Sequence, residues 1–385
     1  MGCVVRSIYF DYNATTSLDP KVRDAMVPFL DEVFGNPSSV HHVGRKARAC
    51  LDEFRDRTAS VLGCKPGEVI FTSGGTESNN LAVLGTARLL RDKGRHLITS
   101  PVEHHAVLHC FEYLQRKEGF EVTWLPVDHE GRVSPDDLRK AIRRDTTIVS
   151  IMAANNETGT VQPVAELGAT CKEMGVLFHT DAVQWFGKEH FPNIHLFNAH
   201  LVSICSHKFH GPKGSGALFV KSPLFPDPIL LGGAHENERR AGTENLAAIA
   251  GFVEALELFV KEPVFSREPL FSLSSSLAAA LTPLEGVQAR GSSARRLSNT
   301  VSFTVAGADS ISLLAALDLR GICASSGSAC SSGSLNPSHV LLAMGVEPSL
   351  ANSFVRFSLG RHSTSEEVSF VSSILPDVIK SVRGF

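Results

Sequence analysis

The stretch "LVSICSHKFHGPKGSGALFV", residues 201–220, decides the fold class, because it joins two short apolar runs through a polar, glycine-rich turn. Runs such as "LVSIC" and "GALFV" are typical of strands that are buried on both faces. Ser206, His207 and Lys208 follow the first run directly. In open α/β sheets, ligands bind where the strands end. The stretch therefore predicts functional side chains at the end of a strand, whereas a lysine taken alone is usually exposed on the surface.

Comparable runs recur along the chain and alternate with helical segments. "EVIFTS", "HLITS", "TTIVSIMAA" and "VLFHTD" predict further strands, and "SPDDLRKAIRR" opens with a capping box. Such alternation predicts βαβ units and a mostly parallel sheet. The segment "DPKVRDAMVPFLDEVFGNP" predicts one amphipathic helix capped by Asp19, with Pro28 inside it.

The alternation of strands and helices changes at about residue 262, where a segment rich in proline and serine precedes a second, shorter set of elements. We therefore predict a large domain over residues 16–261. Residues 1–15 and 262–385 are expected to form a smaller α+β domain.

Composition excludes several classes of protein. A formal charge of -3 and the lack of any Lys/Arg run give no reason to expect nucleic acid as a partner. The eight cysteines form no CxxC pair, which predicts a reducing compartment. No signal-peptide core and no apolar run long enough to span a bilayer are present, so we expect a cytoplasmic protein without a membrane segment.

Two further stretches resemble parts of a cofactor site. In "VIFTSGGTESNN", a predicted strand leads through two glycines into a helix, which suits a phosphate cradle or an ordinary turn. In "VLFHTDAVQ", Asp181 ends another strand and could equally cap the next helix. A lysine, a carboxylate and a phosphate cradle are what pyridoxal phosphate needs, because the amine forms a Schiff base and the carboxylate keeps the pyridine nitrogen protonated.

One cysteine lies in an unusual setting. Cys330 is in the middle of "SSGSACSSGS", residues 325–334. Serine and glycine favour turns and mobile loops, so this thiol is expected on a loop that moves. It is either a reactive cysteine or an unused loop thiol.

Ten motifs in order resemble one family. They are "DYNATT", "GNPSSVHHVGR", "FTSGGTESNN", "VEHHAV", "NNETGT", "HTDAVQ", "SHKFHGPKG", "RAGTEN", "SSGSACSSGS" and "VRFSLGR". Together they resemble the group I cysteine desulfurases, the NifS/IscS-like branch of the fold-type I pyridoxal phosphate enzymes. The matches run from Asp11 to Arg361. The resemblance implies an α/β fold-type I transferase, with a mostly parallel seven-stranded sheet flanked by helices, plus the smaller α+β domain.

The resemblance also implies a role for each site residue. Lys208 would hold the cofactor as a Schiff base, and Cys330 would be the nucleophile that receives sulfur. His104 would stack on the cofactor ring and assist proton transfer, with His105 a bystander. The other cofactor-binding residues would be Asp181 at the pyridine nitrogen, Gln184 at the ring oxygen, and Gly75, Thr76, Ser206 and His207 at the phosphate, joined by Thr243 from the other subunit of a homodimer. Asn156 and Arg356 would bind the substrate carboxylate.

The function implied is a cysteine desulfurase, which converts L-cysteine to L-alanine and leaves sulfur as a persulfide on the enzyme. That sulfur would pass to an acceptor protein, such as an iron–sulfur scaffold, for cluster assembly or thio-modification. The alternatives are a selenocysteine lyase, an aminotransferase or other class-V relative that does not use Cys330, and a non-catalytic sulfur-relay or scaffold protein. No metal site is expected, because no further ligand accompanies the adjacent His104 and His105. Cys323 is expected to serve packing.

Overall fold

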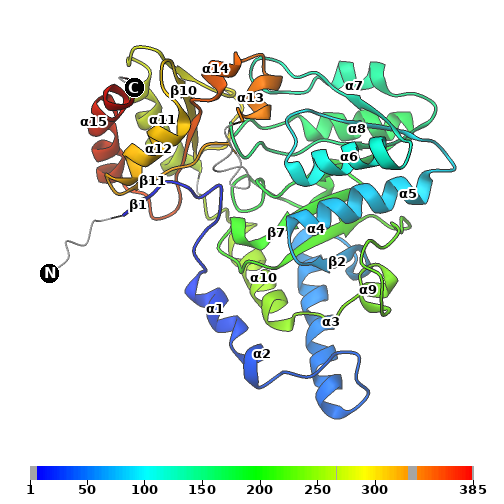
Figure 1. Cartoon of the computed structure of the whole chain (residues 1–385). Coiled ribbons are helices and arrows are strands. Elements are labelled where there is room, and N and C mark those ends of the chain that lie inside the picture. Colours follow the sequence, from blue (N-terminus) through cyan, green and yellow to red (C-terminus); the bar gives the residue numbers. More distant parts are fainter. Residues whose placement is uncertain (1–6, 266, 328–335, 384–385) are drawn as a thin grey trace.

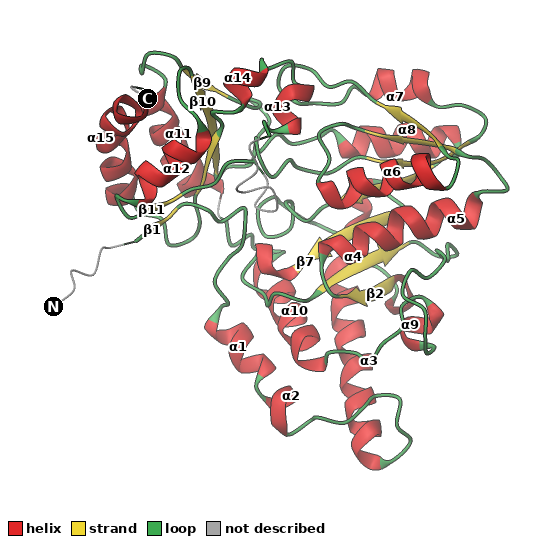
Figure 2. Cartoon of the chain, viewed as in Figure 1, coloured by secondary structure: helices red, strands yellow, loops and turns green. Residues whose placement is uncertain are grey.

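The structure is a computed structural model that describes residues 7–265, 267–327 and 336–383. It has a larger part built on a seven-stranded sheet and a smaller part built on a three-stranded sheet (Figure 1 and Figure 2). A two-stranded pairing of β1 (Ile8–Tyr9) with β11 (Ile322–Cys323) joins the beginning of the described chain to the smaller part.

The larger part confirms the predicted α/β class. In sheet order, its strands are β2 (Val69–Thr72), β8 (Gly216–Val220), β7 (Leu201–Cys205), β6 (Leu177–Asp181), β5 (Thr146–Ser150), β3 (His96–Thr99) and β4 (Glu121–Trp124). β8 runs antiparallel to both of its neighbours, and all pairs from β7 to β4 are parallel. The sheet is therefore mostly parallel, and β5, β6 and β7 end at the same edge.

Helices cover both faces of this sheet. Successive residues of a strand point to opposite faces, so each strand can contribute to two hydrophobic clusters. On β5, Ile148 and Val149 belong to different hydrophobic clusters. The helices and short helical turns of the larger part are α1 (Pro20–Met26), α2 (Pro28–Asp31), α3 (His42–Leu62), η1 (Pro66–Glu68), α4 (Gly75–Asn80), η2 (Leu81–Gly85), α5 (Thr86–Leu90), α6 (His105–Lys117), α7 (Pro135–Ala141), α8 (Val164–Met174), η3 (Ile194–Phe197), η4 (Ser206–Lys208), α9 (His235–Glu238) and α10 (Leu246–Phe259).

The predicted single helix after Asp19 is wrong, because the chain forms α1 and α2 instead. Asp19 does cap α1, since its side chain accepts a hydrogen bond from the Lys21 backbone N–H. The two helices meet at Val27 and Pro28. Proline has no backbone N–H, so it cannot continue the hydrogen-bond ladder of α1 and begins a new helix.

The smaller part has a hydrophobic core of its own. Its elements are α11 (Arg267–Leu281), β9 (Val287–Ala289), β10 (Thr300–Val305), α12 (Ser310–Asp318), β11, α13 (His339–Ala343), α14 (Pro348–Ala351), β12 (Val355–Ser358) and α15 (Ser365–Val382). β10 lies between β12 and β9 and is antiparallel to both. Ile8, Phe10 and Tyr12 pack in the same cluster as residues of α11 and α15. The domain limits given above stay a prediction.

The segment after β1 runs between the two parts. The Asn13 backbone N–H donates to Ser358 Oγ at 2.9 Å, and the Thr16 N–H donates to the His207 carbonyl at 3.0 Å. These bonds hold the segment against a strand of the smaller part and against the turn after β7. No helix within residues 7–265, 267–327 and 336–383 is long and apolar enough to cross a membrane.

Candidate active site

A cavity of about 200 Å³ lies where β5, β6 and β7 end. The residues predicted from the sequence that line it are Gly75, Thr76, His104, Asn156, Asp181, Gln184, His207, Lys208 and Arg356. They come from the ends of several strands, from the start of α4 and from β12 of the smaller part. The fold therefore brings together residues that are widely separated in the sequence.

Lys208 presents its amine to two backbone carbonyls. Its Nζ donates to Asn13 O at 2.8 Å and to Ala14 O at 2.7 Å. Burial lowers the pKa of Lys208 to about 8, and the nearby Arg356 also lowers it. A buried amine with a pKa near 8 is unprotonated often enough near neutral pH to act as a nucleophile or a base.

Asp181 ends β6 as a buried carboxylate. Its Oδ1 accepts from the Val183 N–H at 3.0 Å and its Oδ2 from Asn79 Nδ2 at 2.6 Å. Burial raises the pKa of Asp181, whereas these two hydrogen bonds and Lys208 lower it. Among the described residues, Asn79 Oδ1 is buried without a hydrogen-bond partner. The site thus offers a buried carboxyl group and an unsatisfied amide oxygen, which suit a protonated nitrogen of a bound group.

The turn between β2 and α4 contains two glycines, which allow its backbone to lie close to a ligand. Gly74 has a φ of 145°, outside the range that other residues readily adopt. A Cβ on Gly75 would come within 2.7 Å of Val183 Cγ2. Thr76 follows at the start of a helical run over residues 75–90. Such a turn, with the free N–H groups of the helix start, can receive an anion such as a phosphate.

The structure does not bring the Ser206 hydroxyl into the cavity. Ser206 Oγ donates to Pro212 O at 2.5 Å and to Ser215 O at 3.0 Å, so it closes the glycine-rich turn. The preceding residue, Cys205, lines the cavity instead. Neighbouring residues of a strand point to opposite sides, which is why the Cys205 side chain and not that of Ser206 faces the cavity. The role of Ser206 at the phosphate stays a prediction.

Thr243 also lies outside the cavity. It lines a separate pocket of about 140 Å³ of the same chain, together with Ser73 and Arg240. Its predicted contribution from another subunit stays a prediction. The predicted nucleophile, Cys330, lies outside the described residues. Cys323 is half-buried on β11, where its sulfur is 3.5 Å from Ser7 Oγ.

His104 caps α6, and this fixes its tautomer. Its Nδ1 accepts from the Ala106 N–H at 3.1 Å. Burial lowers the pKa of His104 to about 4, and Lys208 also lowers it. The ring is therefore neutral near pH 7, and its proton lies on Nε2.

The adjacent His105 lies 6.3 Å from His104 between ring centroids and packs more closely against two other histidines. Its ring centroid is 5.0 Å from that of His109 and 4.6 Å from that of His339. In the part of the chain that the structure describes, no group of three or more His, Cys, Asp or Glu side chains is arranged to hold a metal ion.

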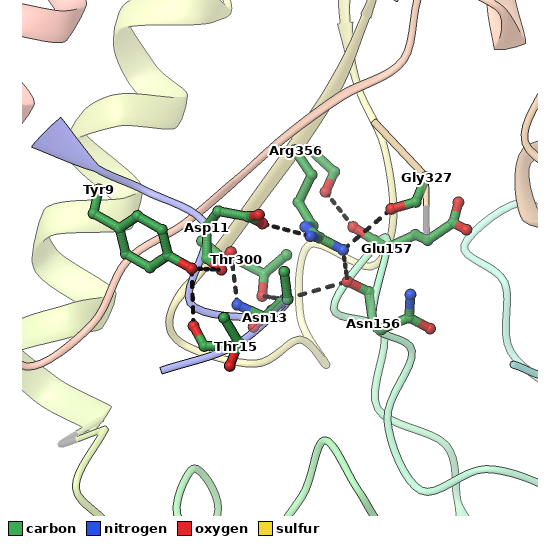
Figure 3. A network of polar contacts seen from close by, with 12 residues as sticks. Tyr9, Asp11, Asn13, Thr15, Asn156, Glu157, Thr300, Gly327 and Arg356 are labelled. Carbon is green, nitrogen blue, oxygen red and sulfur yellow. Dashed lines mark hydrogen bonds and ion pairs between the residues drawn. The ribbon is translucent and has the colours of Figure 1, made fainter. Parts of the chain in front are cut away.

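Arg356 is fully buried on β12 and is held by three acceptors (Figure 3). Its NH2 donates to Asp11 Oδ1 at 2.7 Å, and its NH1 donates to Asn156 O at 2.7 Å and to Gly327 O at 3.3 Å. Its Nε has no hydrogen-bond partner among the described residues. A guanidinium with an unused donor at a cavity wall can bind a carboxylate.

Sequence reasoning missed several residues that shape this site. Asn13 and Ala14 supply the carbonyls that hold Lys208, Asn79 holds Asp181, and Cys205 lines the cavity. The motifs "DYNATT" and "FTSGGTESNN" contain Asn13, Ala14 and Asn79 and are the signal in the sequence, but a motif does not indicate which of its residues hold another side chain.

Comparison with known proteins gives consistent matches over nearly the whole chain. The aminotransferase class-V profile matches residues 8–371. A cysteine desulfurase IscS from Dictyoglomus turgidum is 48% identical over 380 residues, covering 98% of this chain and 96% of that protein. One from Methanosarcina thermophila is 46% identical, covering 98% and 93%. A solved NifS-like protein superposes with a TM-score of 0.90 at 36% identity, covering 97% of this chain and 100% of that one.

Proposed function

The chain belongs to the aminotransferase class-V family, and we propose that within it the protein is a cysteine desulfurase that uses pyridoxal phosphate. It converts L-cysteine to L-alanine. The identities of 46–48% to two cysteine desulfurases, over nearly the full length, support this activity. The observation that carries it is the grouping of Lys208, Asp181 and Arg356 around one cavity.

The residues of the cavity fit the cofactor. Lys208 would bind it covalently, Asp181 would face the ring nitrogen, and Gln184 would face the ring oxygen. The turn at Gly75 and Thr76 would receive the phosphate. When bound, pyridoxal phosphate withdraws electrons from the carbon that carries the substrate amino group.

Lys208 is placed to move a proton at that carbon. Its amine is buried, its pKa is about 8, and the carbonyls of Asn13 and Ala14 hold it in position. It therefore interconverts between base and acid near neutral pH. His104 is neutral and keeps a proton on Nε2, so it can donate a hydrogen bond without adding charge to the cavity.

Arg356 is placed to fix the substrate carboxylate. Asp11 and Asn156 orient the guanidinium, and burial excludes water from it, which strengthens a charge-assisted hydrogen bond. The substrate is then bound at two points, its amino group towards Lys208 and its carboxylate towards Arg356.

In the sulfur transfer, the Cys330 thiolate attacks the substrate sulfur. The carbon–sulfur bond breaks as a sulfur–sulfur bond forms, and the carbon takes up a proton to give L-alanine. Cys330 is left as a persulfide, which an acceptor protein such as an iron–sulfur scaffold would collect. We place this reaction in a homodimer, which is supported by the position of Thr243 outside the cavity of its own chain. We place it in the cytoplasm, which is supported by the free state of every described cysteine.

The test measures L-alanine from L-cysteine, with mass spectrometry of the enzyme. A persulfide should appear on Cys330, and Cys330→Ala should make little alanine while still binding pyridoxal phosphate. Cys323→Ala is the matched control and should behave as the parent. Formation of a keto acid, or a persulfide on another cysteine, would contradict the proposal. Faster turnover of selenocysteine than of cysteine would favour a selenocysteine lyase.

A further inference from the structure

A second lysine, Lys188, is completely buried behind the cavity. It lies four residues after Gln184 and is 2% exposed. Its Nζ donates to Asn13 Oδ1 at 2.7 Å and to Gln184 Oε1, and it lies 5.2 Å from the centre of the Phe265 ring. Among the described residues, it forms no ion pair with a carboxylate. A buried amine without an acidic partner is costly, so its two amide contacts must compensate for its burial.

The amine decides which way the Asn13 amide points. An amine in this position has hydrogens to donate, so each amide turns its oxygen towards it. Asn13 Oδ1 also accepts from Asn299 Nδ2 at 3.0 Å. The Nδ2 of Asn13 is consequently directed away, towards Thr300 Oγ1 at 2.9 Å and Asn156 O at 3.3 Å (Figure 3).

The same amine and the Asn13 carbonyl together fix the orientation of Gln184, which lines the cavity. With Oε1 held by Lys188, the Nε2 of Gln184 is the group left on the other side, and it donates to Asn13 O at 2.9 Å. That bond uses one of the two N–H groups, and the second is available to an acceptor in the cavity. A flipped amide would instead present an oxygen to that acceptor.

We propose that Lys188 is a positioning residue that locks the amide of Gln184 so that it presents only N–H donors to an anionic ring oxygen of the cofactor. The inference rests on the proposed use of pyridoxal phosphate. It does not depend on the charge of Lys188. Burial lowers the pKa of Lys188 well below its usual value, Lys208 and Arg356 lower it further, and Glu189 raises it. Ammonium and neutral amine both carry hydrogens for the two amide oxygens.

The experiment compares the holoenzyme of the parent with Lys188→Met, which has similar length but no donor. Lys221→Met is the matched control, because Lys221 is exposed at the end of β8. The readout is the midpoint pH at which the visible absorption of the bound cofactor changes. Loss of a hydrogen bond to an anionic oxygen should raise that midpoint by about one to two pH units. The control should keep the parent midpoint.

A double-mutant cycle shows whether Lys188 acts through Gln184. Gln184→Ala should raise the midpoint as Lys188→Met does, and the double variant should shift it no further than either single change. Lys188→Gln, which retains N–H donors, should recover most of the parent midpoint and also serves if the methionine variant does not fold. A parent-like midpoint in Lys188→Met, or shifts that add in the double variant, would overturn the inference. A parent that takes up no pyridoxal phosphate would instead refute the proposed function, and with it the acceptor for Gln184.

Discussion

Replacing Arg356 by lysine should separate substrate binding from cofactor binding. The change keeps a positive charge on β12 but removes the planar fork of donors. In the parent, NH2 and NH1 are anchored 2.7 Å from Asp11 Oδ1 and 2.7 Å from Asn156 O, and Nε has no partner among the described residues. A lysine amine can satisfy Asp11, but it cannot at the same time reach a substrate carboxylate in the same geometry.

The size of the effect follows from the lost contact. A hydrogen bond to a charged group contributes about 1.5–3 kcal/mol. We therefore expect kcat/KM for L-cysteine to fall about 10- to 150-fold, mainly through KM. Uptake of pyridoxal phosphate should be unchanged, because Lys208, Asp181 and the turn at Gly75 are not altered.

The assay is L-alanine formation over a range of L-cysteine concentrations, with the visible absorption of the bound cofactor measured in parallel. Arg361→Lys is the control, since Arg361 is also ion-paired, at 2.7 Å from Asp19, but does not line the cavity. An unchanged KM in Arg356→Lys, or equal losses in both variants, would refute the assignment of the carboxylate to Arg356.

Three further predictions concern the cavity and the sheet beneath it. Burial lowers the pKa of His179 to about 3, so the unfolded chain binds a proton that the folded chain excludes as the pH falls below about 6.5. In urea unfolding between about pH 6 and pH 4, this histidine should cost the parent about 1.4 kcal/mol of unfolding free energy for each pH unit, and His179→Gln should abolish that loss. An unchanged dependence of the unfolding free energy on pH would contradict the prediction. Alkylation of Cys205, followed by mass spectrometry, should fall when the cofactor is added, whereas the half-buried Cys50 should label equally in both forms. Asp181→Asn should slow exchange of the substrate α-proton with deuterated water by about 10- to 100-fold, and exchange at the parent rate would count against the ring-nitrogen contact.

The large sheet could be predicted from the sequence, because its strands are continuous apolar runs bounded by turn residues. Lys208 and Asp181 could be expected near one another, since parallel strands that lie side by side end at the same edge. The prediction of one helix after Asp19 was wrong. The apolar spacing continues past Pro28, and only the missing N–H of this proline separates α1 from α2.

The site could be predicted only in part. The sequence does not show which way the side chains at a strand end point, or which residues far apart in the chain form hydrogen bonds. The choice between Cys205 and Ser206 depends on which residue is the last of β7, and strand ends are the least certain feature of a sequence. The roles of Asn13 and Lys188 depend on hydrogen bonds between residues 175 positions apart, which no local pattern encodes.

The position of Asn13 also affects when the site can form during synthesis. Its carbonyl holds Lys208, and its own N–H is held by Ser358, which is 345 positions later in the chain. A ribosome makes residue 13 long before residue 358, so the early segment waits without its partner while the large sheet is being produced. Closing so long a loop is slow compared with local helix formation. Nascent chains that stop before β12 would therefore lack the Ser358 contact with the Asn13 N–H, and the segment that holds Lys208 would be fully anchored only near the end of translation.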